Sequence, residues 1–365
     1  MNRRRVYGFF LSGLLMFLPS AFASTLYVGT CHTPSYSTIS AAVAAAAPGA
    51  TINICPGRYP EQIVLTQAVT LKGISSSDGD LIIVVVPPNG LQANAQDGMG
   101  DAIAAQLFVE ISPGPTNISN LTFDASNNQV SDGVYVVGVL VQNSPATINH
   151  IVTQNQIGGD GGVGVWIQGG SSNPQVTVEN SSIHDFDDIG VWTQINPGPG
   201  QLTAVIQDNF VNGQTASGLI ANSDVALANG TTNTVKDNYL ASGQTGISVS
   251  GGASGTVAHN NLITDGTAIA IGGDGLTGGN ISVTNNDIFN SSVEGILVNG
   301  GLPAVQHNTI DHVPVGIEFA CNADGNAVNN TIMDSGIGVN DLPAGSNSSN
   351  SYFNVQAITG GSCGR

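Results

Sequence analysis

The feature that constrains this chain most is a loose repeat, Val-x-x-Asn-x-Ile followed several residues later by Gly-Ile-x-Val. Two clear copies begin at Val235 and Val305 and continue at Gly246 and Gly316. The asparagine position recurs every 22 to 29 residues, at Asn155, Ser181, Asn209, Asn238, Asn261, Asn286, Asn308 and Asn330. A repeat of this length is typical of a solenoid, in which every repeat forms one coil of the stack.

The chemistry of the strands decides the kind of solenoid. Each repeat holds two or three short runs rich in Val and Ile, separated by Gly, Asn, Asp and Ser, as expected of strands joined by turns. Only residues 39–47 sustain a helical apolar period, and leucine is too sparse for a leucine-rich repeat. These patterns predict an all-β fold, a single-stranded parallel β-helix of about ten coils whose strands stack ~4.8 Å apart. We expect the asparagine position to form a ladder at a bend, because asparagine accepts left-handed backbone and bonds to its own copy in the next coil.

The N-terminus has the pattern of an export signal. Three arginines precede an apolar run from Val6 to Leu18, and residues 21–23 read Ala-Phe-Ala, a small-x-small cleavage site. This predicts a secretory signal peptide over residues 1–23 and an exported protein, periplasmic or extracellular. The alternative, a single-pass membrane anchor, is disfavoured because the run is short.

The rest of the chain is expected to form one solenoid with a cap at each end. We predict an N-terminal cap with the first coils over residues 24–115, regular coils over 116–340 and a C-terminal cap over 341–365. In the first part, strands are expected at residues 25–28, from Thr51 and from Val69. A short amphipathic helix over residues 36–43, capped by Ser or Thr, should cover the open end of the first coil. Residues 89–100 are expected to form a protruding loop.

The charge balance excludes several partners. Residues 1–23 carry three of the seven basic residues and no acidic one, which leaves four basic against 25 acidic residues and a formal charge of −21. Phosphate binding needs a basic surface, so nucleic acid is excluded as a partner, and an anionic membrane is disfavoured for the same reason. The acidity is explained by the solubility of an exported protein. Ca²⁺ binding is an alternative that stays open, and no other cofactor is expected; we expect a monomer.

The four cysteines lie two at each end of the mature chain. Because stacked coils keep the two ends apart, we predict the pairs Cys31–Cys55 and Cys321–Cys363. Disulfides at these places would hold the ends where the stack frays. A metal-binding role is disfavoured because no close Cys-x-x-Cys pair exists, and no metal site is predicted.

The opening of the mature chain resembles a known superfamily. The segment from Tyr27 to Gly73, with Thr-Ile, Pro-Gly-Arg-Tyr and Val-Thr-Leu-Lys-Gly at its strands, resembles the start of pectin-lyase-like right-handed β-helix proteins. The later Asn-x-Ile and Gly-Ile-x-Val copies are similar to the parallel β-helix repeats of the same superfamily. The resemblance covers nearly the whole mature chain and implies a right-handed coil. It does not imply one activity, because the superfamily includes polysaccharide lyases, glycoside hydrolases, methylesterases, epimerases, adhesins and tailspikes.

Motifs of individual families narrow the chemistry. No arginine of the mature chain falls in the coils, which excludes a lyase with an arginine base, and the motifs of pectin methylesterases and alginate epimerases are absent. Asp187-Asp188-Ile189 is similar to the Asp-Asp-x-Ile motif of polygalacturonase-like hydrolases, and Asp160 lies one coil earlier, although that family's Gly-His-Gly and Arg-Ile-Lys motifs are missing. Glycoside hydrolysis needs two carboxylates across the scissile bond, so Asp160, Asp187 and Asp188 are candidate catalytic residues. The alternative is that these aspartates only form turns.

An aromatic column is the most specific local signal. Aligning the Gly-Ile-x-Val strands places Tyr135, Trp166 and Trp192 at one outward position in three successive coils, with Gln168 and Gln194 also outward two residues after the tryptophans. The column continues with Ile220, Ser248, Ala270, Leu297, Glu318 and Asn340. Aromatic faces stack on the C–H groups of sugars, and amides bond to sugar hydroxyls. The candidate substrate-binding residues are therefore Tyr135, Trp166, Gln168, Trp192 and Gln194. The alternative is that the rings pack against one another or under a loop of the chain.

Together these patterns predict a secreted β-helix protein that binds an extracellular polysaccharide on this strand face and, if it is an enzyme, cleaves it. A non-enzymatic structural or adhesive surface protein is the alternative. Because the expected groove holds no basic residue, a neutral glycan is favoured over a polyuronate, unless Ca²⁺ bridges the two negative surfaces. The histidines, such as His184 and His312, are interpreted as turn residues.

Overall fold

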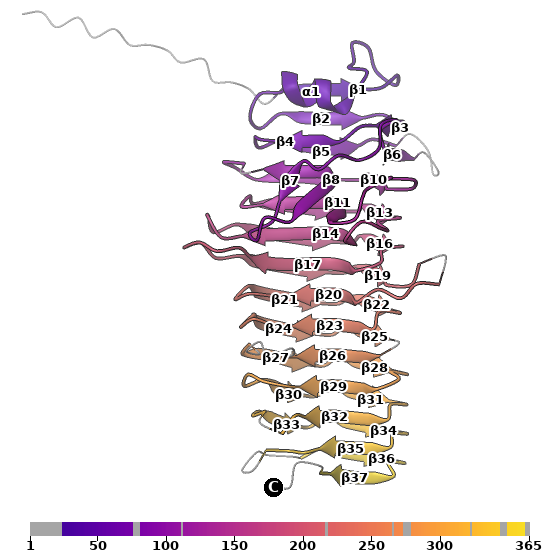
Figure 1. Cartoon of the computed structure of the whole chain (residues 1–365), viewed down its shortest axis with the longest axis vertical. Helices are drawn as coiled ribbons and strands as arrows, with labels where there is room; N and C mark the ends of the chain where they lie inside the picture. Colours follow the sequence, from indigo (N-terminus) through magenta and orange to yellow (C-terminus); the bar gives the residue numbers. More distant parts are fainter. Residues whose placement is uncertain are drawn as a thin grey trace, which may run out of the picture.

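The computed structural model describes residues 24–361, without residues 76–80, 111, 216–217, 265, 273–278, 322 and 344–348. These residues form a parallel β-helix whose coils stack along one long axis (Figure 1). Three sheets of 12, 12 and 13 strands run along the stack, and each coil adds one strand to each sheet. The predicted fold class is therefore confirmed, but the expected number of about ten coils is too low.

The three sheets are called A, B and C in the order in which the chain enters them. Sheet A consists of β1 (Thr25–Val28), β2 (Thr51–Ile54), β5 (Thr70–Gly73), β9 (Thr116–Ser119), β12 (Ala146–Asn149), β15 (Gln175–Glu179), β18 (Thr203–Gln207), β21 (Thr232–Lys236), β24 (Ser254–Ala258), β27 (Ile281–Thr284), β30 (Ala304–Gln306) and β33 (Asn326–Val328). Sheet B consists of β3 (Gly57–Pro60), β6 (Ile82–Val85), β10 (Thr122–Asp124), β13 (Val152–Gln154), β16 (Ser182–His184), β19 (Phe210–Asn212), β22 (Tyr239–Ala241), β25 (Asn261–Ile263), β28 (Asp287–Phe289), β31 (Thr309–Asp311), β34 (Thr331–Met333) and β36 (Ser351–Phe353). Sheet C consists of β4 (Ile63–Leu65), β8 (Ala102–Glu110), β11 (Val134–Gln142), β14 (Gly161–Gly169), β17 (Ile189–Ile195), β20 (Ser223–Leu227), β23 (Thr245–Val249), β26 (Thr267–Ile271), β29 (Glu294–Val298), β32 (Val315–Phe319), β35 (Ile337–Asn340) and β37 (Ala357–Gly360), with β7 (Ala95–Gln96) pairing antiparallel to β8.

The alternation of side chains along the strands builds the core. In one middle coil, Val235 of sheet A, Leu240 of sheet B and Ile247 of sheet C all point inward and have no exposed surface. The residues between them point outward because successive side chains of a strand face opposite sides. The inward residues of all coils merge into one continuous apolar cluster from Val28 to Val339.

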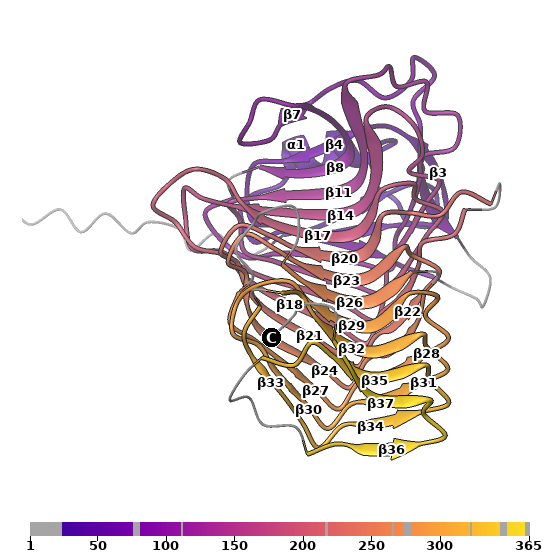
Figure 2. The same cartoon turned by 60° about the horizontal axis from the view of Figure 1, so that its bottom comes forward.

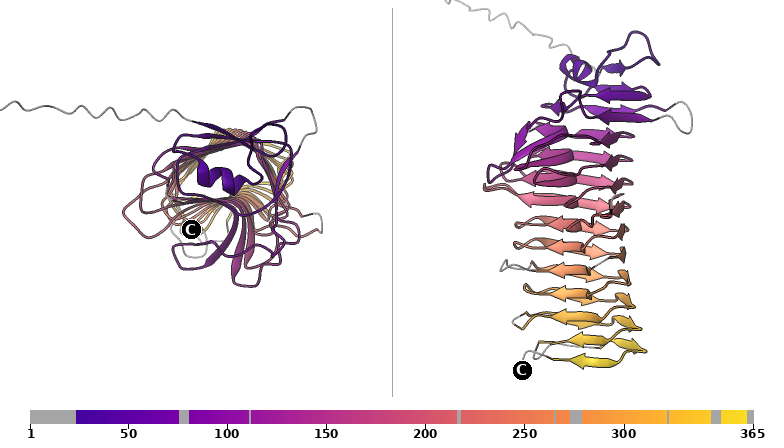
Figure 3. Two further views of the ribbon diagram at one scale, coloured as in Figure 1. Left: turned by 90° about the horizontal axis from the view of Figure 1, so that it is seen from above. Right: turned by 45° about the vertical axis from the view of Figure 1, so that its right-hand side comes forward.

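The N-terminal end of the stack is closed as the sequence predicts. Helix α1 (Ile39–Ala45) buries Ile39 against the first coils, and its N-cap is Thr38, whose Oγ1 accepts from the Ala41 amide at 3.1 Å. Viewed from above, α1 lies across the end of the coil (Figure 3, left). The predicted Cys31–Cys55 disulfide is present beside it. Cys363 lies outside the described residues, so the second pairing stays a prediction.

A ladder of asparagines runs along the bend between sheets A and B. In a representative pair, Asn260 Oδ1 accepts from the Asn238 backbone amide at 3.1 Å and from Asn238 Nδ2 at 2.9 Å. The rungs are Asn209, Asn238, Asn260, Asn286, Asn308, Asn330 and Asn350, and Ser181 joins them at the upper end. Asn286, a middle rung, has no exposed surface. A ladder at this bend is therefore present as predicted.

Two of the predicted rungs and the predicted backbone conformation are wrong. Asn260 is the rung instead of Asn261, which is the first residue of β25. Asn155 is not a rung, because the register pairs Val152 with Ser182 and so places Ile151 above Ser181. The left-handed conformation belongs to the residue before each rung from Ser181 to Asn330, and to the equivalent residue of the two coils above, at Asn120, His150, Asn180, Asp208, Asp237, His259, Asn285, His307 and Asn329. Asparagine, aspartate and histidine tolerate this conformation better than other residues with a side chain.

Departures from regular coils occur in the upper part of the stack. Strands β8, β11 and β14 have nine residues each, whereas the strands of sheet C from β20 to β32 have five. The extra length bends out of the stack (Figure 2). The predicted loop over residues 89–100 lies beside these strands and contributes β7. At the other end, β36 and β37 lie within the predicted C-terminal cap and add strands to sheets B and C.

The described helix was compared with the requirements of a membrane-spanning helix. Among the described residues, no helix combines the length and the apolar character needed to cross a bilayer.

The ladder generates a stability prediction. Replacing Asn286 with Leu should lower the free energy of unfolding by about 1–3 kcal/mol, because the amides of Asn260 lose their acceptor inside the bend. The measurement is the midpoint of urea unfolding followed by circular dichroism. Asn285→Gly is the matched control, since Asn285 is exposed and glycine adopts the same left-handed backbone. Equal midpoints for Asn286→Leu and the parent would show that the ladder does not stabilise the stack.

Candidate functional site

The outer face of sheet C carries an apolar cluster that is separate from the core. It is formed by β8, β11, β14, β17 and Ala226 of β20, and its largest member is Trp166. The other buried members are Ile103, Ala105, Phe108, Val137, Leu140, Val163, Ile189 and Ala226, with Ala95, Tyr135 and Trp192 packed against them. An apolar cluster outside the coil is unusual for a turn-rich acidic protein and marks this face as different from the other two.

The two tryptophans stack on each other as the register predicts. Trp166 pairs with Trp192 across β14 and β17, and their ring centroids are 4.2 Å apart with an angle of 6° between the planes. Val165 and Ile167 point into the core, as do Val191 and Thr193. Two residues further on, Gln168 pairs with Gln194. The predicted arrangement of these four residues on neighbouring strands is thus present.

The predicted column is wrong at Tyr135 and Ile220. Leu140 precedes Trp166 in register, and Ala226 follows Trp192. The long β11 strand explains the first error, because Tyr135 lies in its outer extension. Its ring still reaches the stack, with edge-on contacts at centroid distances of 5.2 Å to Trp166 and 6.2 Å to Trp192.

The two tryptophans differ in exposure. Trp166 has no exposed surface, whereas Trp192 is half-buried. Trp166 has Leu140 on the strand above it and Trp192 on the strand below. The far face of Trp192 is followed by Ala226, whose methyl group is too small to cover an indole ring. Trp192 therefore has a large neighbour, Trp166, on one side and only the small Ala226 on the other.

A loop of the same chain packs on this face, as the alternative interpretation of the tryptophans expected. This cover loop, residues 94–101, includes β7, and the carbonyl oxygen of Gln96 accepts from Gln142 Nε2 at 2.6 Å. At its tip, Gly98 lies so close to Asn196 that a Cβ atom there would be 2.7 Å from the Asn196 Cβ. The loop thus spans from β8 to the end of β17.

A row of amides lies beside the aromatic stack. Gln168 Oε1 accepts from Gln142 Nε2 at 2.7 Å and from Asn196 Nδ2 at 3.2 Å. Gln168 and Gln194 were expected to be outward, and they do lie on the outer face, but they are 0 % and 6 % exposed. Trp166 Nε1, Gln168 Nε2 and Gln194 Oε1 are buried without a hydrogen-bond partner in the described part of the chain. Buried polar atoms without a partner are unfavourable unless ordered water satisfies them.

The three candidate catalytic aspartates take different roles. The carboxylate of Asp187 accepts from the backbone amides of Gly158 at 2.8 Å and Gly162 at 2.6 Å. It therefore holds the turn before β14, as the turn interpretation expected. Asp188 is half-buried and accepts from Asn222 Nδ2 at 2.7 Å. Asp160 is exposed at the end of the same turn.

Electrostatics link Asp188 and Asp160 to the aromatic stack. Burial raises the pKa of the Asp188 carboxyl, and the negative charges of Asp187 and Asp160 raise it further against the opposing hydrogen bond from Asn222. Burial also raises the pKa of Tyr135 to about 12, with contributions from the charges of Asp160, Asp188, Asp101 and Asp97. Four carboxylates thus act electrostatically on this phenol.

Two of these carboxylates come from the cover loop and were missed in the sequence. Asp97 is 9 % exposed, and its Oδ1 accepts from the amides of Met99 at 2.8 Å and Asp101 at 2.9 Å. The loop lies outside the repeat, so the repeat pattern contains no sign that it returns to Tyr135. The spacing of Asp97 and Asp101 about Gly100 is the only local signal, and it indicates a turn.

Below Trp192 the outer face of sheet C becomes shallow. Ala226, Ser248 and Ala270 occupy the tryptophan position in the next three coils, so small side chains form the floor. Glu318 follows further down and accepts from Asn340 Nδ2 at 2.7 Å. Burial and then the charges of Asp341 and Glu294 raise its pKa, although the hydrogen bond from Asn340 opposes them. Sheet C thus carries carboxylates at both ends of a small-residue floor, and its described residues include no lysine or arginine.

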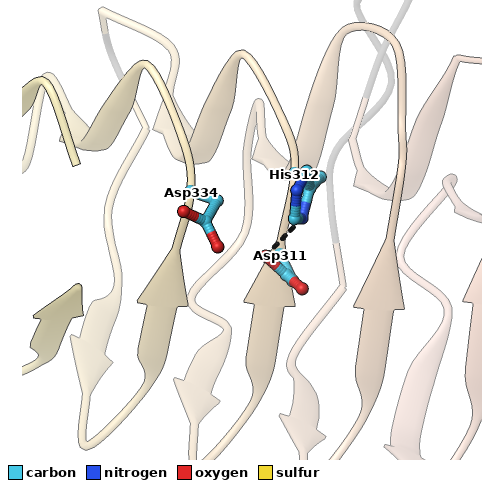
Figure 4. Close-up of side chains that lie close together, drawn as sticks. All are labelled: Asp311, His312 and Asp334. Carbon is cyan, nitrogen blue, oxygen red and sulfur yellow. Dashed lines mark hydrogen bonds and ion pairs between the residues drawn. The ribbon is translucent and has the colours of Figure 1, made fainter. Parts of the chain in front are cut away.

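The residues Asp311, His312 and Asp334 form a cluster elsewhere, on the bends that follow sheet B (Figure 4). Their potential ligand atoms lie within 4.8 Å of one another. His312 Nδ1 is already bonded to Asp311 Oδ1 at 2.7 Å, and Asp334 accepts from Asn354. His312 and Asp334 adopt left-handed backbone in successive coils, which agrees with the interpretation of His312 as a turn residue.

Comparisons with known proteins agree with the fold. The family model for the right handed beta helix region matches residues 224–362. Among solved structures, a GH136 lacto-N-biosidase from Eubacterium ramulus is similar with a TM-score of 0.56 at 10 % identity, over 92 % of this chain and 68 % of that chain. The catalytic domain of a GH87 alpha-1,3-glucanase in complex with nigerose gives 0.55 at 15 % identity, over 93 % and 66 %. The A-module of a mannuronan C-5 epimerase from Azotobacter vinelandii gives 0.53 at 15 % identity, over 88 % and 92 %.

At these identities the similarity defines the fold and not the activity. The chain is a right-handed parallel β-helix protein, and the resemblance to the pectin-lyase-like proteins is confirmed at the level of fold. A search of curated protein sequences gave no match.

The raised pKa of Asp188 generates a prediction about pH. A carboxyl whose pKa is higher in the folded than in the unfolded protein binds its proton more tightly when folded, so the stability that it contributes at low pH is lost as pH rises. The loss begins near the unfolded value of ~3.9 and ends above the raised folded value. Asp188→Asn removes this titration and keeps an acceptor for Asn222. The melting temperature of the parent relative to Asp188→Asn should therefore fall as the pH rises above ~3.9.

Asp187→Asn is the matched control for this measurement. An amide supplies one acceptor oxygen where the carboxylate accepts from both Gly158 and Gly162, so this variant should be less stable at every pH. A constant difference between the parent and Asp188→Asn across the pH range would contradict the raised pKa.

Proposed function

We propose that the protein is exported, binds a neutral polysaccharide along the outer face of sheet C, and hydrolyses it next to Trp192. The observation that carries the proposal is the open ring face of Trp192, which lies between the carboxylates around Tyr135 and the small-residue floor below. A sugar ring stacked on this face would occupy the space left by Ala226. The apolar face of a pyranose would meet the indole, and its hydroxyls would meet carboxylates and amides.

The charge of the face supports a neutral ligand. Asp160, Asp188, Asp97 and Asp101 surround Tyr135, and no basic residue of the described strands of sheet C offsets them. A polyuronate would be repelled unless cations bridged the two surfaces. The similar structures include an alpha-1,3-glucanase in complex with nigerose, which is a neutral sugar ligand held by a protein of this fold.

Asp188 and Asp160 supply the chemistry of hydrolysis in this proposal. Asp188, with its raised pKa, holds the proton that is transferred to the glycosidic oxygen as the bond to the anomeric carbon breaks. Asp160, exposed and one coil above, is the carboxylate that takes the proton of the attacking water or forms the covalent intermediate. Asp187 keeps the turn that carries Asp160 in place.

Export is supported by two features. The pattern of residues 1–23, which lie outside the described residues, is typical of a signal peptide. The disulfide between Cys31 and Cys55 fits an oxidising compartment.

A binding measurement tests the aromatic platform. Trp192→Ala should weaken binding of a neutral polysaccharide by at least tenfold and change the melting temperature little, because Trp192 is half-buried at the end of the stack. Trp166→Ala is the contrasting variant, and it should cost about 3–5 kcal/mol of stability because this ring is fully buried. Affinity electrophoresis in gels containing single neutral polysaccharides gives the binding, and calorimetry gives the melting temperature. Unchanged binding by a stable Trp192→Ala protein would contradict the proposed site.

A product measurement tests hydrolysis. Asp188→Asn and Asp160→Asn should each lower the release of reducing ends by at least a hundredfold while the polysaccharide still binds, since proton transfer contributes about 10²–10⁴-fold. Unsaturated products would indicate lyase chemistry instead. None are expected, because β-elimination needs a uronate and a base, and the described strands of sheet C carry no lysine or arginine that could serve as that base. Binding without any release of reducing ends by the parent would assign the protein to the alternative class, a non-enzymatic adhesive or structural protein.

A further inference from the structure

A second aromatic pair lies on the outer face of sheet B. Phe210 of β19 and Tyr239 of β22 are in register, with ring centroids 5.6 Å apart and an angle of 14° between the planes. They are 42 % and 39 % exposed. A single exposed aromatic side chain needs no explanation, but two stacked and exposed rings form a platform.

A depression of about 500 Å³ lies directly above this platform. Its origin is the small side chain of Ser182, which stands in register between Val152 of the coil above and Phe210 of the coil below. Because Tyr239 covers one face of the Phe210 ring, the opposite face is turned towards the space at Ser182. The depression therefore has an aromatic wall on one side.

The rim of the depression is polar. His150, Asn180 and Asp208 line it, and each occupies the left-handed position of the bend before sheet B in three successive coils. The bend geometry repeats, so an imidazole, an amide and a carboxylate follow one another along the stack. His150 and Asn180 are both bonded to Asn149, while the Asp208 carboxylate has no hydrogen bond or ion pair within the described part of the chain.

The charge of the rim selects the ligand class. Asp208 is the acidic residue in the lining, and the lining contains no lysine or arginine. The nearest basic residue on the adjoining strand of sheet A is Lys236, which is paired with Asp237 at 3.4 Å. A uronate would be repelled here, whereas a neutral sugar offers hydroxyls to Asp208 and Asn180 and an apolar face to Phe210.

We propose that this depression, called the sheet B slot and defined by His150, Asn180, Ser182, Asp208 and Phe210, is a second binding site for a neutral pyranose residue. It is separate from the site on sheet C and does not depend on it. Phe210 lies in β19, two strands after the β17 strand of Trp192, so the two sites lie on different faces of neighbouring coils. A protein with two such faces binds a polysaccharide matrix with higher avidity than either face alone.

The test silences the sheet C site first. Trp192→Ala protein is titrated by calorimetry with neutral hexasaccharides of β-1,4-glucan, α-1,3-glucan, β-1,4-mannan and β-1,4-xylan, and with hexagalacturonate as the anionic control. Ser182→Val is then added, because it fills the slot with the side chain found at the same position in the coil above, Val152. Phe210→Ala removes the platform. Thr177→Val, at an outward position of sheet A, is the matched control for a surface valine.

The expected result is that Trp192→Ala protein still binds a neutral hexasaccharide. Adding Ser182→Val or Phe210→Ala should weaken this binding at least tenfold, while Thr177→Val leaves it unchanged and all variants melt within a few degrees of one another. If Ser182→Val lowers the melting temperature strongly, the hexasaccharide affinity of the Phe210→Ala variant decides whether the slot binds the sugar.

The failures of the two sites are distinguishable. Loss of all binding on Trp192→Ala alone would overturn the sheet B slot and leave the sheet C site intact. Binding that is unaffected by Trp192→Ala and abolished by Ser182→Val would support the slot and overturn the site on sheet C. Affinity that is unchanged by Ser182→Val and Phe210→Ala, or a Phe210-dependent affinity for hexagalacturonate, would overturn the slot or its neutral ligand class.

Discussion

The hydrogen bonds between asparagines at the bend from sheet A to sheet B are the constraint on which the other features depend. Each rung gives one oxygen to two donors of the coil above, as Asn260 does to Asn238, and the rungs from Ser181 to Asn330 are buried. A slip of one residue at this bend would turn every inward side chain of the following strands outward. The ladder therefore keeps equivalent residues of successive coils in line. Both aromatic stacks, Trp166 with Trp192 and Phe210 with Tyr239, rely on this alignment.

Much of this alignment could be predicted from the repeat. Val165 and Val191 point into the core and are paired in register, so the residues that follow them, Trp166 and Trp192, must lie next to each other on the outer face. The helix at Ile39 and the Cys31–Cys55 disulfide follow from local signals, an apolar period with a cap and the need to close the end of the stack. In each case the determining interaction is local in sequence or repeated in every coil.

The sequence was less informative where the chain departs from the repeat. The sequence does not distinguish Asn260 from Asn261, since both are asparagine. Only the geometry of the bend shows which one is the rung and which one begins a strand. Tyr135 was misplaced because β11 is four residues longer than a regular strand of sheet C, such as β23, and no motif reports strand length. The cover loop brings Asp97 and Asp101 to Tyr135 through contacts that are remote in sequence. The loop is also linked to Gln168, because the side-chain amide of Gln142 donates both to the carbonyl of Gln96 and to Gln168.

The bends themselves have a consequence for how such a protein can change over time. The position before each rung needs only a residue that tolerates left-handed backbone, and asparagine, aspartate and histidine all occur there. The fold is indifferent to which of them is present, yet they differ in charge, in proton affinity and in the hydrogen bonds they form. One surface column is thus free to acquire new recognition chemistry through single substitutions, without any cost to the core that lies a residue away. The architecture separates the evolution of the surface from the maintenance of the fold.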